Sequence, residues 1–389
     1  MNRSMNEEII TYLTVFLAPI AFLFILAYFT SLSTRRYCAY GFLASLLKGK
    51  EAKRITEEHI IEALRKKSLD EALEAIGATE LGAYISERAA LIKTYDDVEN
   101  MVYEYLSKDY MFIKTYLPKD SLKLYDVFIE KFDLFNIKQV IRRLASKSLH
   151  KVNFVPLGKI FESNMLSKLE EATSIDDVVN VVRQAGLYDY SVIIEEMQAK
   201  ITSEHESFKA RMILEKKLDE EYFSKLLKIA LKLRGREQLL PAIGSLIDLN
   251  IVNAAVRAVA SGKPQGILEI IPEVYYVLTK DNVKSFLDAR TLEKLSEKLE
   301  YTPYSEIGRR IVDIYKTTKD PLLVEKTILD YSLSKIKENI STAMHTPAVL
   351  LHYFLIKEKE LRLTLLLFRI FFQKIPYEKY LPYFKPGSA

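Results

Sequence analysis

A short pattern occurs three times along this chain of 389 residues. In each copy an acidic residue and a Leu are followed, nine positions after the acid, by an Arg that stands behind an apolar residue. The acid and Arg of the three copies are Asp133 and Arg142, Asp248 and Arg257, and Glu360 and Arg369. The acids are 115 residues (248 − 133) and 112 residues (360 − 248) apart. This spacing predicts three copies of one unit, much longer than the roughly 20–50 residues of a solenoid repeat.

The composition and the apolar periodicity predict that these units are all-α. Gly and Pro number 12 each, about 3% of the chain, against average usage of about 7% and 5%. Long helices with short loops tolerate so little Gly, whereas a sheet protein with many tight turns does not. Apolar residues recur at helical spacing, for example at Ile175, Val178, Val179 and Val182.

Local signals also predict where helices start and where the units divide. Ser68, Thr94 and Ser174 each precede acidic residues in the way that an N-cap precedes the first helical turn. Short linkers are expected near residues 148–159 and 260–266. We therefore expect helical units at 34–149, 150–262 and 263–389.

The repeated acid and Arg are expected to have separate roles. A helix turns about 100° per residue, so positions nine apart lie on opposite faces and cannot pair with each other. The acid is expected near a helix N-terminus, where its charge suits the helix dipole or its oxygen caps free N–H groups. The Arg reaches a neighbouring helix or, alternatively, a partner protein. Both interpretations of the Arg residues stay open at this point.

The segment before the first unit is apolar enough to cross a membrane. Residues 9–32 carry no charge, and a bilayer core of about 30 Å needs roughly 20 apolar residues as a helix. A cleaved signal peptide and a buried core helix are the alternatives, although a signal peptide usually has a shorter apolar region. Positive charges follow the segment, and the positive-inside rule then keeps the rest of the chain in the cytoplasm. These charges are Arg35, Arg36, Lys48 and Lys50.

No motif in the sequence points to catalysis, a cofactor or nucleic acid. The stretch "SGKPQG" at 261–266 lacks the spacing and the Ser or Thr of a phosphate-binding loop. His345 and His352 could share a helix face, but no third metal ligand accompanies them. The single cysteine, Cys38, has no nearby His. A net charge of +4 is small for this length and does not indicate a nucleic-acid surface. We expect a protein that is not an enzyme.

An ordered set of segments resembles the C subunit of the archaeal and vacuolar-type rotary ATP synthases, whose eukaryotic relative is the d subunit. The resemblance covers roughly residues 34–380. The family signature Asp-x-x-Asn-(Leu/Ile), followed by Arg, matches Asp133, Asn136, Ile137 and Arg142. The segments are "YCAYGFLASLLKG" at 37–49, "ATELG" at 78–82, "FDLFNIKQVIRR" at 132–143, "LEKKLDEEYFSKL" at 214–226, "IDLNIVNAAVRAVASGK" at 247–263 and "YFLIKEKELRLTLLLFR" at 353–369.

The chain departs from the family in two respects. The Asn that follows the acid by three residues is replaced by Ile251 in the second unit and by Leu363 in the third, with Asn250 as a shifted candidate. The family is usually soluble and peripheral, whereas this chain has the apolar segment 9–32. The last unit keeps the Lys-Glu-x-Glu signature of the family at Lys357 to Glu360.

The resemblance implies three similar helical domains around a pseudo-threefold axis, arranged as a funnel. The funnel would receive the D and F subunits of the central stalk, and the opposite face would rest on the membrane proteolipid ring. A rotor component of this kind couples proton or sodium transport to ATP synthesis at the cell membrane without binding a nucleotide. The alternative is a membrane-anchored helical scaffold or adaptor unrelated to rotation.

Overall fold

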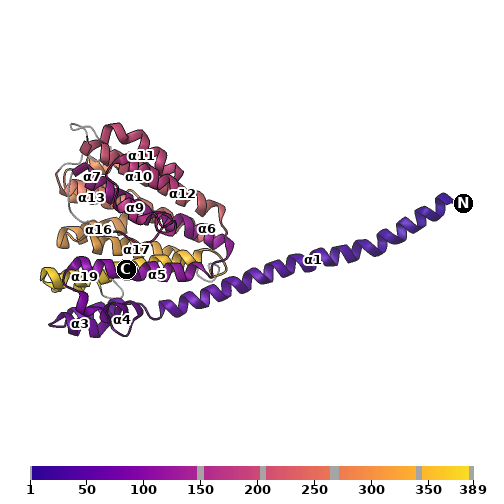
Figure 1. Ribbon diagram of the computed structural model, residues 1–389, viewed down its shortest axis with the longest axis horizontal. Coiled ribbons are helices and arrows are strands. Elements are labelled where there is room, and N and C mark those ends of the chain that lie inside the picture. The colour runs from indigo at the N-terminus through magenta and orange to yellow at the C-terminus, as the bar shows by residue number, and fades with distance from the viewer. Residues whose placement is uncertain (1, 147–152, 202–206, 263–270, 339–343, 385–389) are drawn as a thin grey trace.

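The structure is a computed structural model that describes residues 2–146, 153–201, 207–262, 271–338 and 344–384. Within these ranges the regular elements are helices, with no strand, so the all-α prediction is confirmed (Figure 1). The predicted division at 149/150 falls outside the described residues, and the division at 262/263 adjoins the segment 263–270, which also lies outside them.

We describe the helices in three stretches, divided at the predicted boundaries. The first stretch holds α1 (Asn2–Glu51), α2 (Glu57–Leu64), α3 (Leu69–Ile76), α4 (Glu80–Ser86), η1 (Ala89–Leu91), α5 (Tyr95–Lys114), α6 (Lys119–Phe128) and α7 (Glu130–Ser146). The second holds α8 (Lys159–Glu162), α9 (Leu166–Glu170), α10 (Ile175–Gln184), α11 (Tyr188–Ile201), α12 (Ser207–Lys232) and α13 (Arg236–Ala260). The third holds α14 (Lys280–Leu287), α15 (Leu292–Leu299), α16 (Ser305–Thr318), α17 (Pro321–Lys337), α19 (Ala348–Gln373), η2 (Tyr377–Lys379) and η3 (Leu381–Tyr383).

The three N-cap predictions are confirmed. The Ser68 hydroxyl accepts from an N–H in the first turn of α3, and Thr94 does the same for α5. Ser174 caps α10, and the Asp177 carboxylate in turn accepts the N–H of Ser174 at 2.9 Å. Each cap satisfies backbone groups that the helix itself leaves free, which fixes where the helix begins.

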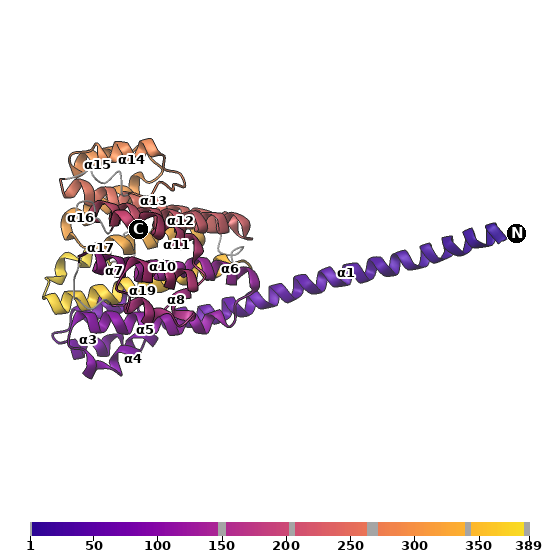
Figure 2. The same cartoon turned by 45° about the horizontal axis from the view of Figure 1, so that its top comes forward.

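Helix α1 is continuous for 50 residues and has two parts (Figures 1 and 2). Its C-terminal part packs into the body, where Tyr40, Leu43 and Leu47 are buried. Its N-terminal part projects away from the body. A single helix therefore runs through the predicted boundary between the membrane segment and the first unit.

The longer helices of the body form a series of packed pairs, in which each helix contacts the next. α7 packs on α12, α12 on α13, α13 on α17, α17 on α19, and α19 on α5. The repeated motif lies on α7, α13 and α19. The C-terminal ends of these three helices lie at the side of the body away from the N-terminal end of α1 (Figure 1).

One described helix, α13, is long and apolar enough to cross a membrane by length and composition. Because 72% of its apolar window is buried inside the body, it is a core helix of the fold. Among the described side chains of α1, Leu17–Tyr28 form an apolar stretch that is shorter than a membrane-spanning helix. A membrane crossing by residues 9–32 stays a prediction.

Candidate functional site

The repeated acid of the second unit is a fully buried acceptor for three backbone N–H groups. Asp248 accepts from Tyr276, Val277 and Leu278 at 2.9, 2.8 and 3.1 Å. The Tyr304 hydroxyl donates to the same carboxylate at 3.0 Å. Burial, together with this carboxylate, raises the pKa of Tyr304. Asp248 thus fixes the residues that lead into α14.

The acid of the first unit does the same for the first turn of α8. Asp133, also fully buried, accepts the N–H groups of Lys159 and Ile160 at 2.8 and 2.9 Å. Gly158 makes this approach possible, since its φ is 107° and a Cβ there would lie 2.5 Å from the Asp133 carboxylate. Burial raises the pKa of Asp133 to about 7, although the two N–H groups act in the opposite direction.

Asn136, one turn after Asp133, holds the same loop at a second point. Its amide donates to the carbonyl of Val155 at 2.8 Å and accepts the N–H of Val155 at 2.9 Å. The corresponding residues of the other units, Ile251 and Leu363, are buried apolar side chains. Asn250 is not a shifted substitute, because its amide donates to the Leu246 carbonyl of its own helix.

The acid of the third unit reaches back to the beginning of the body. Glu360 accepts the N–H of Ile55 at 2.8 Å, which lies just before α2. Its other oxygen binds the Lys357 ammonium at 2.8 Å, and both side chains are almost completely buried. A buried carboxylate of this kind is stabilised by its paired cation and by the backbone N–H.

The three acids therefore connect the three stretches in a closed order. We call the short segments that contain their acceptor-bound N–H groups the entry segments, namely residues 55–56 before α2, 155–160 at the start of α8 and 276–278 before α14. The acid on α7 holds the segment entering the second stretch, and the acid on α13 holds the segment entering the third. The acid on α19 holds the segment between α1 and α2 of the first stretch. Each acid thus caps free N–H groups of another segment.

The expected position of the acids near their own helix N-terminus is correct for one copy only. Asp133 lies in the first turn of α7, whereas Asp248 and Glu360 lie in the middle of α13 and α19. The prediction was wrong there because it placed the free N–H groups on the same helix. The groups that need an acceptor belong to the entry segments, which only the tertiary packing brings near.

The repeated Arg residues lie near the C-terminal ends of α7, α13 and α19 and have different surroundings. Arg142 makes two bonds to Glu215 of α12, at 2.9 and 2.5 Å. Arg369 lies 3.6 Å from Asp320, the N-cap of α17. The Arg257 side chain is exposed and forms no ion pair or hydrogen bond in the part of the chain that the structure describes.

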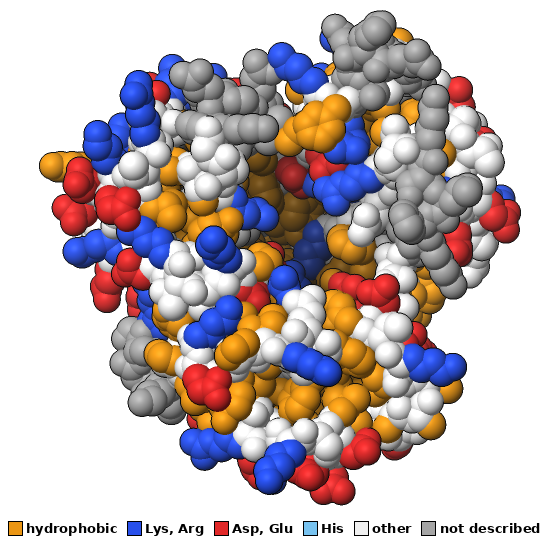
Figure 3. Space-filling view, turned by 90° about the vertical axis from the view of Figure 1, so that its left-hand side faces the viewer, with side chains coloured by type: hydrophobic (Ala, Val, Ile, Leu, Met, Phe, Trp, Pro, Cys, Tyr) orange, Lys and Arg blue, Asp and Glu red, His pale blue; other side chains and the backbone are white. Residues whose placement is uncertain are grey.

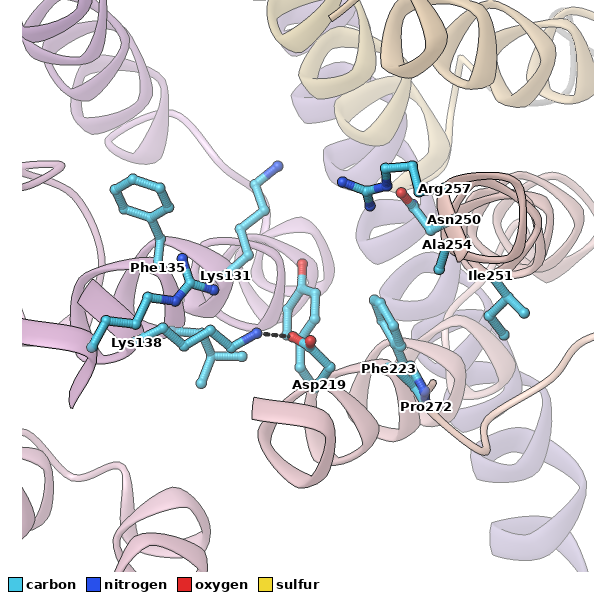
Figure 4. Close-up of a pocket in the computed structure, with 13 residues that line it drawn as sticks. Lys131, Phe135, Lys138, Asp219, Phe223, Asn250, Ile251, Ala254, Arg257 and Pro272 are labelled. Carbon is cyan, nitrogen blue, oxygen red and sulfur yellow. Dashed lines mark hydrogen bonds and ion pairs between the residues drawn. The ribbon is translucent and has the colours of Figure 1, made fainter. Parts of the chain in front are cut away.

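A central cavity of about 480 Å³ lies between α7, α12 and α13. Figure 4 shows Lys131 from α7 and Arg257 from α13 extending into this space from opposite sides. On the side to which α7, α13 and α19 direct their C-terminal ends, the body is hollowed at its centre, with Lys and Arg side chains in and around the hollow (Figure 3). The cavity is lined by Lys131, Leu134, Phe135, Lys138, Arg142, Asp219, Tyr222, Phe223, Asn250, Ile251, Ala254, Arg257 and Pro272.

Positive charge exceeds negative charge on the cavity lining. Four of the lining residues are Lys or Arg and one is an acid, Asp219. Lys138 binds Asp219 at 2.5 Å, and Lys131 contacts Glu358 of α19. Burial raises the pKa of Asp219, against the opposite effect of Lys138. With Arg142 bound to Glu215, Arg257 is the lining cation that lacks an acid among the described residues.

The described residues contain no group of three or more His, Cys, Asp or Glu that could hold a metal ion. His352 is half-buried between α1, α17 and α19, and His345 makes an edge contact with the Tyr37 ring. Cys38 is exposed on α1. Among the described residues the cavity thus offers one guanidinium without an acid, that of Arg257, which can bind an anionic group.

Two of the acids that pair with the cavity cations, Glu215 and Asp219, were not predicted as site residues from the sequence. Glu215 and Asp219 are four residues apart on α12, so they share one face of that helix. That spacing is the sequence signal from which they could have been identified.

Comparison with known proteins gives a consistent result over most of the chain. The model of the family described as ATP synthase (C/AC39) subunit matches residues 43–380. The C subunit of the A-type ATP synthase of Methanocaldococcus jannaschii is 25% identical over 77% of this chain and 74% of its own length. The C subunits of the A-type ATP synthases of Pyrococcus horikoshii and Pyrococcus abyssi are 24% and 22% identical, over 91% and 90% of this chain and 93% and 92% of their own lengths.

Proposed function

Because the chain belongs to the ATP synthase (C/AC39) subunit family, we propose that it is a non-catalytic rotor subunit of an A-type ATP synthase. It couples the central stalk to the proteolipid ring, so that proton or sodium transport drives ATP synthesis, or the reverse. A subunit of an ATP synthase works within a multi-subunit, membrane-associated complex, and rotor coupling is the role within that complex that this geometry suits best.

The observation that carries the proposal is the central cavity with its excess of positive charge. The D and F subunits of the central stalk bind in the hollow around it (Figure 3). Arg257 forms an ion pair with an acidic residue of the stalk, since it lacks an acid within the described part of the chain. Arg142 and Arg369 act within the chain by joining α7 to α12 and α19 to the start of α17.

The three buried acids support this role through their effect on stiffness. A subunit that transmits torque dissipates less of the rotation as elastic strain when its parts cannot shift against each other. Asp133, Asp248 and Glu360 fasten each stretch of helices to the next and the last to the first. Three similar domains at 34–149, 150–262 and 263–389 would then surround the stalk evenly around a pseudo-threefold axis.

Residues 9–32 are proposed to cross the membrane, with the body on the cytoplasmic side. The charges after the segment, Arg35 and Arg36, favour this orientation. Arg36 binds Asp120 of α6 at 2.6 Å, so the body begins about 6 Å of helix beyond residue 32. The body is thereby held close to the membrane surface, as contact with the proteolipid ring requires.

The direct test is mild detergent extraction of native membranes, followed by a pull-down through a C-terminal tag. We expect the catalytic A and B subunits, the D and F subunits and the proteolipid to be recovered together in constant ratio. Recovery of the chain alone, or with unrelated cytoplasmic proteins, would refute the rotor role and favour the membrane-anchored scaffold.

A charge reversal tests the role of Arg257. Arg257→Glu should reduce the amount of the D subunit that is recovered with the chain, because loss of a desolvated interfacial charge pair costs about 2–5 kcal/mol. Arg290→Glu is the matched control, since Arg290 is also exposed but lies after α14, outside the cavity lining. Equal recovery of the D subunit with both variants would exclude Arg257 from the stalk contact.

A further inference from the structure

The N-terminal part of α1 needs an apolar environment on every side. Five successive residues, Phe22 to Leu26, are 49–74% exposed and all apolar. At about 100° per residue, five successive positions cover the whole circumference of a helix. A helix on a membrane surface has one polar face, and this stretch has none. Its surroundings must therefore be hydrocarbon or apolar protein on all sides.

Two hydroxyl groups of this part, those of Thr30 and Thr34, bind within the helix. The Thr30 hydroxyl donates to the Leu26 carbonyl at 2.9 Å, and the Thr34 hydroxyl donates to the Thr30 carbonyl at 2.9 Å. In a medium without water, hydroxyl groups need such internal acceptors. The first contacts with the body follow at Arg36 and Tyr40, whose hydroxyl accepts from Ser121 at 3.2 Å.

The helix is fixed to the body and directed toward the body's midline. Lys50, near its C-terminal end, binds Asp109 of α5 at 2.7 Å and Glu80 of α4 at 3.2 Å. In both Figures 1 and 2, α1 leaves the lower half of the body and slants until its N-terminal end is about level with the middle of the body. A helix anchored in this way moves with the body as one piece.

The body also presents exposed aromatic side chains next to the place where α1 leaves it. Phe42 of α1, Phe112 of α5 and Tyr116 after α5 are 42–55% exposed. The Tyr116 ring contacts both Phe rings, with centroids 5.6 Å from Phe42 and 5.2 Å from Phe112. Met111 beside them is 42% exposed. An exposed apolar cluster of this kind is typical of a surface that contacts protein or membrane.

We propose that residues 9–32 cross the membrane inside the lumen of the proteolipid ring, close to the rotation axis, and that the aromatic cluster of Phe42, Phe112 and Tyr116 rests on the ring. This inference depends on the proposed rotor function. A helix fixed to a rotating body but lying outside the ring would sweep into the stationary membrane subunits. In the lumen, which is apolar on all sides, the helix turns with the ring and meets no stationary part.

The test uses the intact complex and site-directed cross-linking. Cys38 is the single cysteine of the chain, so Cys38→Ser gives a background for Phe24→Cys on α1 and for Tyr301→Cys, an 88% exposed control position on the body. With a photoreactive maleimide we expect Phe24→Cys, and not Tyr301→Cys, to form an adduct with the proteolipid. Because both partners of that adduct rotate together, ATP hydrolysis by the cross-linked complex should be unchanged.

The competing outcomes are distinct. An adduct of Phe24→Cys with a stationary membrane subunit, or loss of ATP hydrolysis after cross-linking to the ring, overturns the lumen position. A map of the complex with only lipid in the lumen does so as well, whereas helical density continuous with Arg36 supports it. If the ring and the stalk do not co-purify with the chain at all, the proposed function itself has failed.

Discussion

Replacement of Asp248 by Ala should loosen the entry segment of the third stretch more than any surface change on the same unit. The substitution removes the acceptor of four donors, of which the Leu278 N–H and the Tyr304 hydroxyl are buried. A buried donor without a partner costs about 1–3 kcal/mol, so these two together cost about 2–6 kcal/mol. The other two donors, at Tyr276 and Val277, are partly exposed and can bind water instead.

We expect the free energy of local unfolding to fall by about 3 kcal/mol, less than the upper end of that range, because removal of the carboxylate also removes the cost of burying it. The assay is hydrogen exchange of the full chain in mild detergent, followed at the amides of residues 276–278. A loss of this size corresponds to about 100-fold faster exchange when these amides open locally. Asp288→Ala is the matched control, since Asp288 is an exposed acid at the end of α14.

A small effect would refute the reasoning. If the amides of residues 276–278 exchange at the same rate in Asp248→Ala and Asp288→Ala, the acid does not hold the entry segment. A change spread evenly over all helices would point to general destabilisation of the unit. We expect faster hydrogen exchange that is concentrated on residues 276–278 and on the start of α14.

Three further predictions concern the other two acids. Gly158→Ala should destabilise the chain by about 1–3 kcal/mol in urea unfolding, because the new Cβ meets the Asp133 carboxylate at a positive φ; an unchanged midpoint would refute this. Burial raises the pKa of Asp133 to about 7, above its unfolded value of about 4, so its stabilising contribution is complete below pH 4 and is lost as the pH rises through 7. Asp133→Asn should therefore reduce the pH dependence of unfolding between pH 4 and 8, and identical profiles would contradict the assignment. Glu360→Ala should lower the free energy of unfolding by about 3–5 kcal/mol, because it leaves the Lys357 ammonium buried without its carboxylate. In a double-mutant cycle, the added Lys357→Met substitution should restore part of that free energy.

The prediction of the fold succeeded where the signal is local. Apolar side chains at Ile175, Val178, Val179 and Val182 lie on one buried face of α10, as their spacing predicted. N-caps need only the residues within one turn, so Ser174 could be identified from its neighbours. The repeated acids and Arg residues were also visible, because a repeat is a property of the order of residues alone.

The partners of those repeated residues were not predictable, because spacing along a helix gives the face of a side chain and not what that face meets. The sequence determined that the chain is helical, that one pattern occurs three times, and that an apolar segment precedes it. Only the tertiary structure decided that Glu360 binds the N–H of Ile55, 305 positions away along the chain. It also decided that Arg142 meets an acid of α12 while Arg257 extends into the cavity. Identical positions in a repeat acquire different neighbours because each helix packs against a different surface.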